Sequence, residues 1–383
     1  MKQTEMRGDP LPFEAHAFRR VAVIGAGSWG TALAATVARS GASVMLWGRS
    51  EEVVNDINAT RTNGRYLEGI ILPDRLFAVH EMSDALKNAD AVMIVVPSRS
   101  IRSVARQVAT YLEPGVPVAV CAKGIEAETG LLMTQVAEEE LPGCPIGVIS
   151  GPTFARETAL GYPTAASVAF PFTHVDRLAP HDSTAARFAC SLSTESFRTY
   201  ISDDLIGVEI GGAVKNVIAI ACGMMTGAGF AENTRAALIT RGMDEMKQLA
   251  EALGGRRETV TGLSGAGDLT LTCSSTTSRN MNLGYQLGQG IARPDCFEGR
   301  PVVVEGEVNA VSVTDLAHRI RVPMPICETV HAVLHKGANL QEAFNALWAR
   351  PIEAEPFALD LSLDHPLPDT RLQFAGVNGA LTL

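Results

Sequence analysis

The stretch RVAVIGAGSWGTALAATVARSG, residues 20–41, decides the fold. Its first part, VAVIGAG (21–27), is an apolar run of β-type residues that ends in glycines. The alanine-rich segment 28–40 has helical composition and is closed by Gly41, the usual residue just past a helix end. A strand that passes through a glycine turn into a helix opens a strand–helix–strand unit.

Short apolar runs recur outward from this stretch, each ending in Pro, Gly, Lys or Ser, at 43–50, 91–98, 117–124 and 145–152. Helical segments lie between them at 101–112 and 131–141, and residues 164–170 and 197–201 complete the set. Strands alternating with helices predict an α/β Rossmann-type, parallel doubly wound sheet over residues 20–202.

The strand signal stops after Asp203, and five segments of helical composition follow. We therefore expect an all-α C-terminal domain over residues 203–350, and the charged motifs described below make it the expected substrate and catalytic domain. Residues 1–19 are interpreted as a loose leader and residues 351–383 as a tail without a clear period. The helical segments are 203–225, 233–253, 307–320, 326–336 and 340–349.

The composition is that of a globular enzyme, since 46% of the 383 residues are hydrophobic and 19% are charged. The net charge of −10 argues against a nucleic-acid partner. Seven cysteines without a CxxC pair indicate reduced thiols and a cytoplasmic protein. No secretory signal is visible, and the longest apolar stretch, 217–225, is far short of the ~20 residues that span a bilayer.

Three glycines, Gly25, Gly27 and Gly30, match the pattern G-x-G-x-x-G in the context that a dinucleotide site requires. The first permits a tight turn, the second lets the backbone approach a pyrophosphate, and the third allows close helix–strand packing. About twenty residues later, where NAD sites carry Asp or Glu, this chain has Arg49. Arginine pairs with a 2′-phosphate, so NADP(H) is favoured, and NAD(H) stays open.

A lysine in the middle of an apolar helix is the most unusual charge in the chain. Lys215 lies in LIGVEIGGAVKNVIAIACGMM (205–225), which is apolar on almost every side and therefore predicted to be buried. Burial lowers the pKa of a lysine and suits it to proton transfer. An ion pair with Glu209 or a snorkelling side chain at the helix edge is the structural alternative.

Two further sets of residues suggest a site for an anionic substrate. Lys123 and Gly151–Thr153 follow predicted strands at their carboxyl ends, where ligands of open α/β sheets bind. The stretch GLSGAGDLTLTCSSTTSRN (262–280) combines a flexible glycine backbone, Asp268, hydroxyl groups and Arg279, an inventory that suits a polyol phosphate. A polar surface loop is the alternative interpretation of this stretch.

Histidines lie outside these stretches, which argues against a histidine-based dehydrogenase dyad or a Ser-His-Asp hydrolase. Cys327, His331 and His335 share one helical face, but nothing near them in sequence suggests a fourth ligand. We predict no metal site.

The motifs together resemble the bacterial NAD(P)-dependent glycerol-3-phosphate dehydrogenases, in order from about residue 20 to 349. The blocks that carry the resemblance are GAGSWGTALA (25–34), YLEGIILP (66–73), AVMIVVPS (91–98), CAKGIE (121–126), SGPTFARE (150–157), GVEIGGAVKNVIAIACG (207–223), GAGDLTLTCSSTTSRN (265–280) and VVEG (303–306).

The resemblance implies reversible reduction of dihydroxyacetone phosphate to sn-glycerol 3-phosphate with NAD(P)H, in the supply of glycerophospholipids. It implies Lys215 as the catalytic acid/base, with Lys123 and Asp268 as further catalytic groups. The implied substrate contacts are Lys123, Gly151, Thr153, Lys215, Asn216, Asp268, Ser278, Arg279 and Asn280. The implied cofactor contacts are Gly25, Gly27, Ser28, Trp29, Gly30, Arg49, Lys123, Ala155, Arg279, Val303 and Glu305.

The acidic, proline-bearing segment 171–186 departs from the family pattern, away from every motif. Two other functions stay open: a Rossmann dehydrogenase of the 3-hydroxy acid or ketopantoate type, and a non-catalytic NADPH-sensing protein. The first leaves the 265–280 block unexplained, and the second needs neither Lys123 nor Lys215. The expected partner is a small-molecule substrate, and a homodimer is left open.

Overall fold

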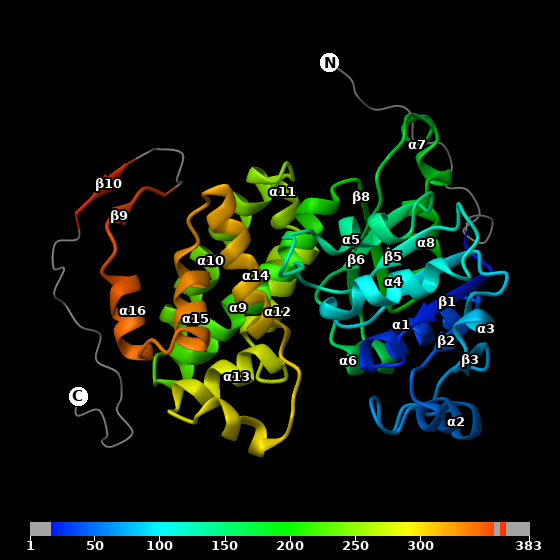
Figure 1. Ribbon diagram of the computed structural model, residues 1–383, viewed down its shortest axis with the longest axis horizontal. Coiled ribbons are helices and arrows are strands. Elements are labelled where there is room, and N and C mark those ends of the chain that lie inside the picture. Colours follow the sequence, from blue (N-terminus) through cyan, green and yellow to red (C-terminus); the bar gives the residue numbers. More distant parts are fainter. Residues whose placement is uncertain (1–16, 356–360, 365–383) are drawn as a thin grey trace. The chain divides into compact units, whose positions relative to one another are not determined.

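The protein is represented by a computed structural model that describes residues 17–355 and 361–364. The chain forms two compact units (Figure 1). Unit 1 comprises residues 1–123 and 132–209, and unit 2 comprises residues 124–131 and 210–383. The sequence-based boundary near residue 203 stays a prediction.

Unit 1 is built on an eight-stranded sheet with the order β3-β2-β1-β4-β5-β6-β7-β8. Apart from Arg20 at the start of β1, the central strands β1, β4 and β5 are buried and consist of Val, Ile, Ala and Met, as parallel strands covered by helices require. The strands are β1 (Arg20–Ile24), β2 (Ser43–Trp47), β3 (Leu76–Val79), β4 (Ala91–Ile94), β5 (Val118–Val120), β6 (Ile146–Ser150), β7 (Thr164–Ala169) and β8 (Phe197–Ser202).

The parallel, helix-covered sheet predicted from the sequence is confirmed, with one correction. Strands β6 and β7 pair antiparallel, with Val148 opposite Ala169, whereas every other neighbouring pair in the sheet is parallel. The sequence also left β3 unpredicted. Its four residues alternate buried and exposed at the sheet edge, so they lack the continuous apolar run of the central strands.

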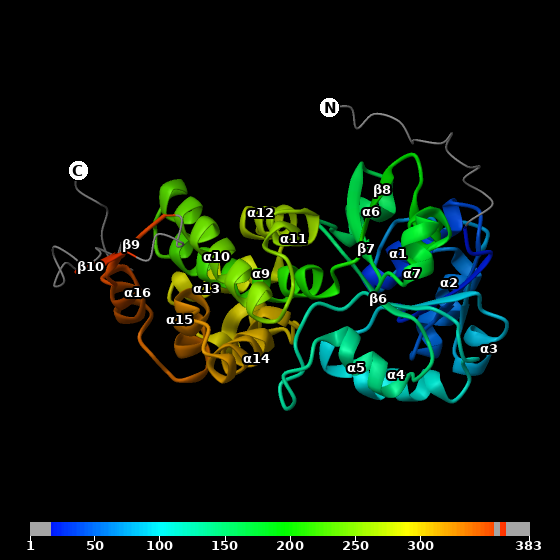
Figure 2. The ribbon, with the colours of Figure 1, turned by 90° about the horizontal axis from the view of Figure 1, so that it is seen from above.

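Helices cover both faces of this sheet. Helices α1, α6 and α8 pack together on one face, while α3, α4 and α5 pack on the other (Figure 2). The helices of unit 1 are α1 (Ser28–Arg39), α2 (Glu51–Thr60), α3 (Met82–Leu86), α4 (Ile101–Ala109), α5 (Met133–Glu140), α6 (Ala155–Leu160), α7 (His174–Leu178) and α8 (Thr184–Leu192).

Unit 2 is helical up to residue 348, as the sequence predicted. Its longest helix, α9, begins within unit 1 and continues through unit 2. The helices are α9 (Leu205–Gly227), α10 (Glu232–Ala252), α11 (Arg257–Val260), α12 (Asp268–Cys273), α13 (Arg279–Gly288), α14 (Glu305–Ile320), α15 (Pro325–His335) and α16 (Leu340–Trp348).

Glycines let α9 and α13 cross with their backbones in contact. A Cβ atom on Gly223 of α9 would lie 2.2 Å from the carbonyl oxygen of Met281. A Cβ atom on Gly284 of α13 would lie 2.1 Å from the carbonyl oxygen of Ile220. No side chain fits at either position, so the spacing of the two helices is set by main-chain atoms.

Helix α9 is long and apolar enough by composition to cross a bilayer, but 89% of its most apolar 18-residue window is buried inside the protein. That degree of burial is typical of the core helix of a globular enzyme.

The described parts of the two chain ends are tied to the units. Phe18, within the predicted leader, is buried with its ring 4.9 Å from that of Phe188. Within the predicted tail, β9 (Ile352–Glu353) pairs antiparallel with β10 (Ser362–Leu363). The remainder of both segments lies outside the described residues.

A buried carboxyl group joins α10 to the first turn of α15. Glu245 is 4% exposed and accepts hydrogen bonds from the backbone N–H groups of Ile326 (2.6 Å) and Cys327 (3.3 Å). It therefore satisfies amide groups that the start of a helix leaves without partners. Burial raises the pKa of Glu245 to about 7, against the opposing effect of these hydrogen bonds.

This raised pKa predicts that the protein loses stability as the pH rises from about 4.5 to about 7. In that window the folded protein holds a proton on Glu245 that the unfolded chain has already released, so a rise in pH favours unfolding. Glu245→Gln keeps an acceptor but cannot ionise. We expect its free energy of unfolding, measured by urea denaturation between pH 5 and 8, to fall less than that of the wild type.

Between pH 5 and 8, the loss of unfolding free energy should be larger in the wild type than in the variant by at most about 3 kcal/mol. Some pH dependence should persist in the variant, because burial also raises the pKa of Glu209 to about 7. Superimposable pH profiles for the two proteins would contradict the assignment.

Candidate active site

The glycine loop between β1 and α1 has the geometry of a phosphate cradle. Gly25 has φ +126°, and a Cβ atom there would lie 2.3 Å from the carbonyl oxygen of Val95. A Cβ atom on Gly30 would lie 1.8 Å from the carbonyl oxygen of Gly25. These two glycines are required by the protein's own packing.

Gly27 differs, because a Cβ atom there would meet no atom within 4 Å. Gly27 is also the N-cap of α1, and no side chain caps the helix there. The open space therefore lies against the unpaired N–H groups and the positive end of the helix dipole. This arrangement fits the pyrophosphate of a dinucleotide.

The next two residues make contacts within unit 1. The Ser28 hydroxyl donates to the carbonyl oxygen of Tyr66 (2.8 Å). Trp29 is half-buried and packs against the small apolar cluster that contains Leu67 and Ile70. The segment around residue 66 thus lies beside the first turn of α1.

Arg49 lies two residues after the end of β2, beyond Gly48, and is exposed. The next residue, Ser50, caps α2 by accepting from the Val53 N–H (3.5 Å). Neither Gly48, Arg49 nor Ser50 is acidic. The carboxyl end of β2 therefore presents a guanidinium group where NAD-specific sites usually place a carboxylate.

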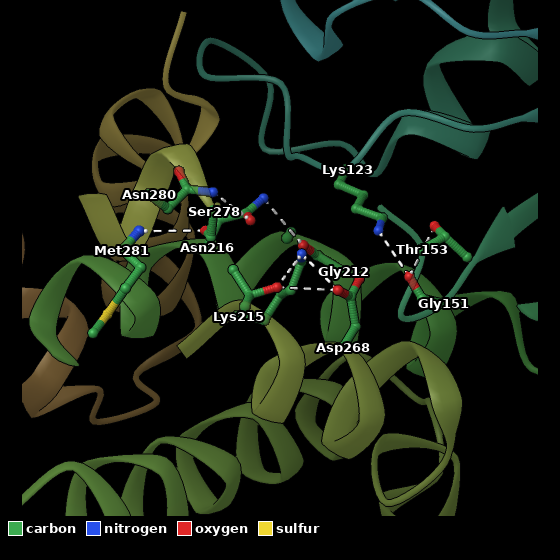
Figure 3. Close-up of polar contacts among 12 residues, drawn as sticks. Lys123, Gly151, Thr153, Gly212, Lys215, Asn216, Asp268, Ser278, Asn280 and Met281 are labelled. Carbon is green, nitrogen blue, oxygen red and sulfur yellow. Dashed lines mark hydrogen bonds and ion pairs between the residues drawn. The ribbon is translucent and has the colours of Figure 1, made fainter. Parts of the chain in front are cut away.

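The residues predicted after β5 and β6 come together (Figure 3). The Lys123 ammonium donates to the carbonyl oxygen of Gly151 (3.2 Å), and the Thr153 hydroxyl donates to the same oxygen (3.2 Å). Because β5 and β6 are parallel neighbours, their carboxyl ends meet at one edge of the sheet. Ala155 begins α6 immediately afterwards.

In unit 2 the predicted lysine and carboxylate form a buried ion pair. The Lys215 ammonium donates to Asp268 Oδ1 (2.8 Å) and to Thr272 Oγ1 (2.8 Å), and the Thr272 hydroxyl donates to Asp268 Oδ1 (3.1 Å) (Figure 3). Their exposed fractions are 6%, 2% and 2%. A buried ion pair is stable only when well-aligned hydrogen bonds compensate for the loss of water around the two charges. Thr272 supplies two of these hydrogen bonds.

The structural alternatives for Lys215 are wrong. The carboxylate of Glu209 accepts instead from the backbone N–H of Thr134 (2.9 Å) and from its hydroxyl. Lys215 itself is buried, so it does not snorkel to the surface. Sequence analysis missed Thr272, although it follows Asp268 by four residues and therefore shares its helix face.

The stretch 262–280 is helical, not a surface loop, near its start. Residues Leu263–Gly267 form a π-helical turn that leads into α12, and Asp268 is the first residue of that helix. A Cβ atom on Gly265 would lie 1.9 Å from the carbonyl oxygen of Val260. Gly265 thus serves close backbone packing, and a Cβ atom on Gly211 of α9 would lie 3.0 Å from the Gly265 Cα atom, so the turn before Asp268 lies beside α9.

The Ser-Arg-Asn sequence begins helix α13. Ser278 is buried and caps the helix by accepting from the Met281 N–H (3.3 Å), and Arg279 is exposed in the first turn. The Asn280 amide donates to Asn216 Oδ1 (2.8 Å), and its oxygen accepts from the Gly306 N–H (2.9 Å). Asn280 thus links α13 to α9 and α14.

The late predicted contacts lie at the start of α14. Val303 is 42% exposed, and Glu305 is the first residue of the helix. One turn later the Asn309 amide donates to the carbonyl oxygen of Ala213 in α9 (3.1 Å). Sequence analysis missed Asn309, because a single Asn on a helix carries no spacing signal.

The predicted residues divide between the two units. The set in unit 1 contains Gly25, Gly27, Ser28, Trp29, Gly30, Arg49, Lys123, Gly151, Thr153 and Ala155. The set in unit 2 contains Lys215, Asn216, Asp268, Ser278, Arg279, Asn280, Val303 and Glu305.

The cysteine–histidine face of α15 is engaged in ordinary contacts. His335 Nε2 lies 2.8 Å from the carbonyl oxygen of Glu307, and Cys327 is buried. Within residues 17–355 and 361–364, no group of three or more His, Cys, Asp and Glu side chains is arranged to hold a metal ion.

Comparison with known proteins gives matches over both units. Residues 20–175 match the family model of the NAD-dependent glycerol-3-phosphate dehydrogenase N-terminus, and residues 204–345 match that of the C-terminus. The chain is 45% identical over 336 residues to glycerol-3-phosphate dehydrogenase [NAD(P)+] of Rhodospirillum rubrum, covering 88% of this chain and 93% of that protein.

Solved structures agree. The glycerol-3-phosphate dehydrogenase of Coxiella burnetii is 37% identical with a TM-score of 0.79, and 88% of this chain and 100% of that one are covered. The enzyme from Saccharomyces cerevisiae is 25% identical with a TM-score of 0.76, covering 86% and 99% of the two chains. The chain therefore belongs to the NAD-dependent glycerol-3-phosphate dehydrogenase family.

Proposed function

We propose that this protein catalyses the reversible, NAD(P)H-dependent reduction of dihydroxyacetone phosphate to sn-glycerol 3-phosphate. The observation that carries the proposal is the buried Lys215–Asp268–Thr272 cluster, which holds an ammonium group in fixed geometry on a rigid helix. The relative and the two solved structures reported above are named glycerol-3-phosphate dehydrogenases, which supports the substrate. The product would enter the synthesis of glycerophospholipids.

When bound, the nicotinamide cofactor supplies the hydride that reduces the ketone carbon. Lys215 stabilises the negative charge that develops on the ketone oxygen and donates a proton to it. Asp268 and Thr272 hold the ammonium group in place and orient its protons. General acid assistance of this kind contributes roughly 10²–10⁴-fold to the rate.

The remaining roles follow the family resemblance. We assign Lys123, Gly151 and Thr153 to substrate binding, with Lys123 also a catalytic and cofactor contact. We assign the Arg279 guanidinium and the N-terminus of α13 to the phosphate, because both are chemically suited to a dianion. Asn216, Ser278 and Asn280 support that helix start through the hydrogen bonds described above.

The cofactor preference is a separate proposal. Arg49 favours NADP(H), because a guanidinium group can pair with the 2′-phosphate that NAD(H) lacks. All seven cysteines are free thiols, which supports the proposed cytoplasmic location.

The direct test is oxidation of NADPH, followed at 340 nm, with dihydroxyacetone phosphate as substrate. We expect rapid oxidation with the phosphorylated ketone and little with unphosphorylated dihydroxyacetone, because phosphate binding orients the ketone. Ketopantoate serves as the competing substrate. Turnover of ketopantoate alone, or NADPH binding without any turnover, would refute the proposed reaction.

Removal of the Lys215 ammonium should abolish most turnover without unfolding the protein. Lys215→Ala alone removes the buried counter-charge of the Asp268 carboxylate, so we choose Lys215→Met combined with Asp268→Asn. We expect kcat to fall by about 10²–10⁴-fold, with the circular dichroism spectrum unchanged. Lys336→Met, which alters an exposed lysine at the end of α15, is the matched control. Near-normal turnover in the folded double variant would exclude Lys215 as the acid.

Replacement of Arg49 should change which cofactor is used. In Arg49→Gln we expect kcat/KM for NADPH to fall about tenfold or more, since a charge-assisted pair with the 2′-phosphate is lost. The value for NADH should stay within about twofold, because NADH has no phosphate at that position. An unchanged NADPH/NADH ratio would show that Arg49 does not select the cofactor.

A further inference from the structure

A buried asparagine outside the recognised motifs is bonded to the glycine loop. Asn63 follows α2 in a segment that returns beside α1, and its exposed fraction is 0%. Its amide nitrogen donates to the carbonyl oxygen of Ala26 (3.1 Å) and to Thr31 Oγ1 (2.8 Å). Its side-chain oxygen accepts from the Tyr66 N–H (3.2 Å).

These partners fix the orientation of the Asn63 amide. A backbone carbonyl can only accept and a backbone N–H can only donate, so nitrogen must face Ala26 and oxygen must face Tyr66. Three of its four hydrogen-bonding positions are used by three separate segments: the glycine loop, helix α1 and the residues after α2. A buried network that is satisfied in this way is rigid.

The bond to Ala26 sets the direction of the next amide group. The Ala26 carbonyl and the Gly27 N–H belong to one planar trans peptide, in which the two groups point in opposite directions. Asn63 holds the carbonyl on its own side, so the Gly27 N–H is turned away from Asn63. Rotation of this peptide would break the bond to Asn63.

Two further hydrogen bonds stabilise the junction between the glycine loop and α1. The Thr31 N–H donates to the carbonyl oxygen of Gly27 (2.9 Å), which anchors the first turn of α1. The Ser28 hydroxyl donates to the carbonyl oxygen of Tyr66, whose N–H is bound to Asn63. The loop is thus tied to the segment after α2 on both sides of Gly27.

We propose that Asn63 is a positioning residue that holds the Gly27 amide and the first turn of α1 ready for the dinucleotide pyrophosphate. The proposal rests on the proposed function only in its choice of ligand. Asn63 does not itself touch the cofactor. It removes the freedom of the loop before binding, which lowers the cost of ordering the loop around the ligand.

The test measures binding of NADPH to the full chain by isothermal titration calorimetry, without substrate. Asn63→Ala removes all three side-chain bonds, and we expect the Kd for NADPH to rise about tenfold or more. Measured at saturating NADPH, KM for dihydroxyacetone phosphate should change less than twofold. That split separates a loop effect from general damage to the enzyme.

Asn58 provides a matched control in the same unit. Its side chain also bridges backbone groups, donating to the carbonyl oxygen of Ala78 (2.8 Å) and accepting from the Ala78 N–H (2.9 Å), but at β3 and not at the glycine loop. Asn58→Ala should lower the melting temperature and leave the Kd for NADPH within twofold. An equal loss of affinity in both variants would overturn the proposal.

A second pair of variants covers a failure of Asn63→Ala to fold. Thr31→Val removes the hydroxyl that Asn63 binds, whereas Thr36→Val removes a buried hydroxyl of the same helix that donates to Ala32. We expect the first to raise the Kd about threefold or more and the second to leave it unchanged. Equal Kd values for both would overturn the proposal.

The calorimetry is independent of turnover. If the protein binds NADPH but does not reduce dihydroxyacetone phosphate, the proposed function fails while the Asn63 comparison still decides the inference. If turnover is as proposed and Asn63→Ala, folded, binds NADPH like the wild type, the inference alone fails.

Discussion

The buried ammonium of Lys215 is the constraint on which unit 2 depends. A charge that is 6% exposed destabilises a fold unless a counter-charge reaches it, and here Asp268 does so at 2.8 Å. To bring that carboxylate to α9, the chain uses a π-helical turn, glycines that allow backbone contact, and a new helix that begins at Asp268 itself. The π-helical turn over Leu263–Gly267 therefore leads directly to one member of this ion pair.

In unit 1, glycines and buried hydrogen bonds shape a site for an anionic ligand. Its ligand is expected to bring negative charge, so the fold presents unpaired amide groups and keeps side chains away from them. Gly25 and Gly30 let the chain turn tightly, and Gly27 leaves the space that a phosphate would occupy. Asn63 then fixes the direction of the peptide that precedes that space.

The sequence predicted the features that depend on local pattern. The alternation of strands and helices predicted the sheet, and the glycine spacing predicted the loop. The charge in the middle of an apolar helix drew attention to Lys215. It could not predict features that depend on which segments meet in space. A helix between β6 and β7 ordinarily signals a parallel crossover, yet these strands run antiparallel.

The sequence did not predict the roles of Thr272, Asn309 and Asn63, for the same reason. A single hydroxyl or amide has no periodicity, and its partner lies on another segment of the chain. The packing role of Gly265 was missed because a glycine needed for close packing looks, in sequence, the same as one needed for flexibility.

The crossing of α9 and α13 has a consequence for ligand length. Helix α9 carries the Lys215 ammonium, and α13 begins with Arg279. Since glycines bring the two backbones into direct contact, the offset between the main-chain positions of Lys215 and Arg279 does not depend on side-chain rotamers at the crossing. The spacing of the two helices is therefore fixed by main-chain atoms. For a substrate bound as proposed, this fixed spacing would favour one distance, and so one number of bonds, between the reacting oxygen and the phosphate.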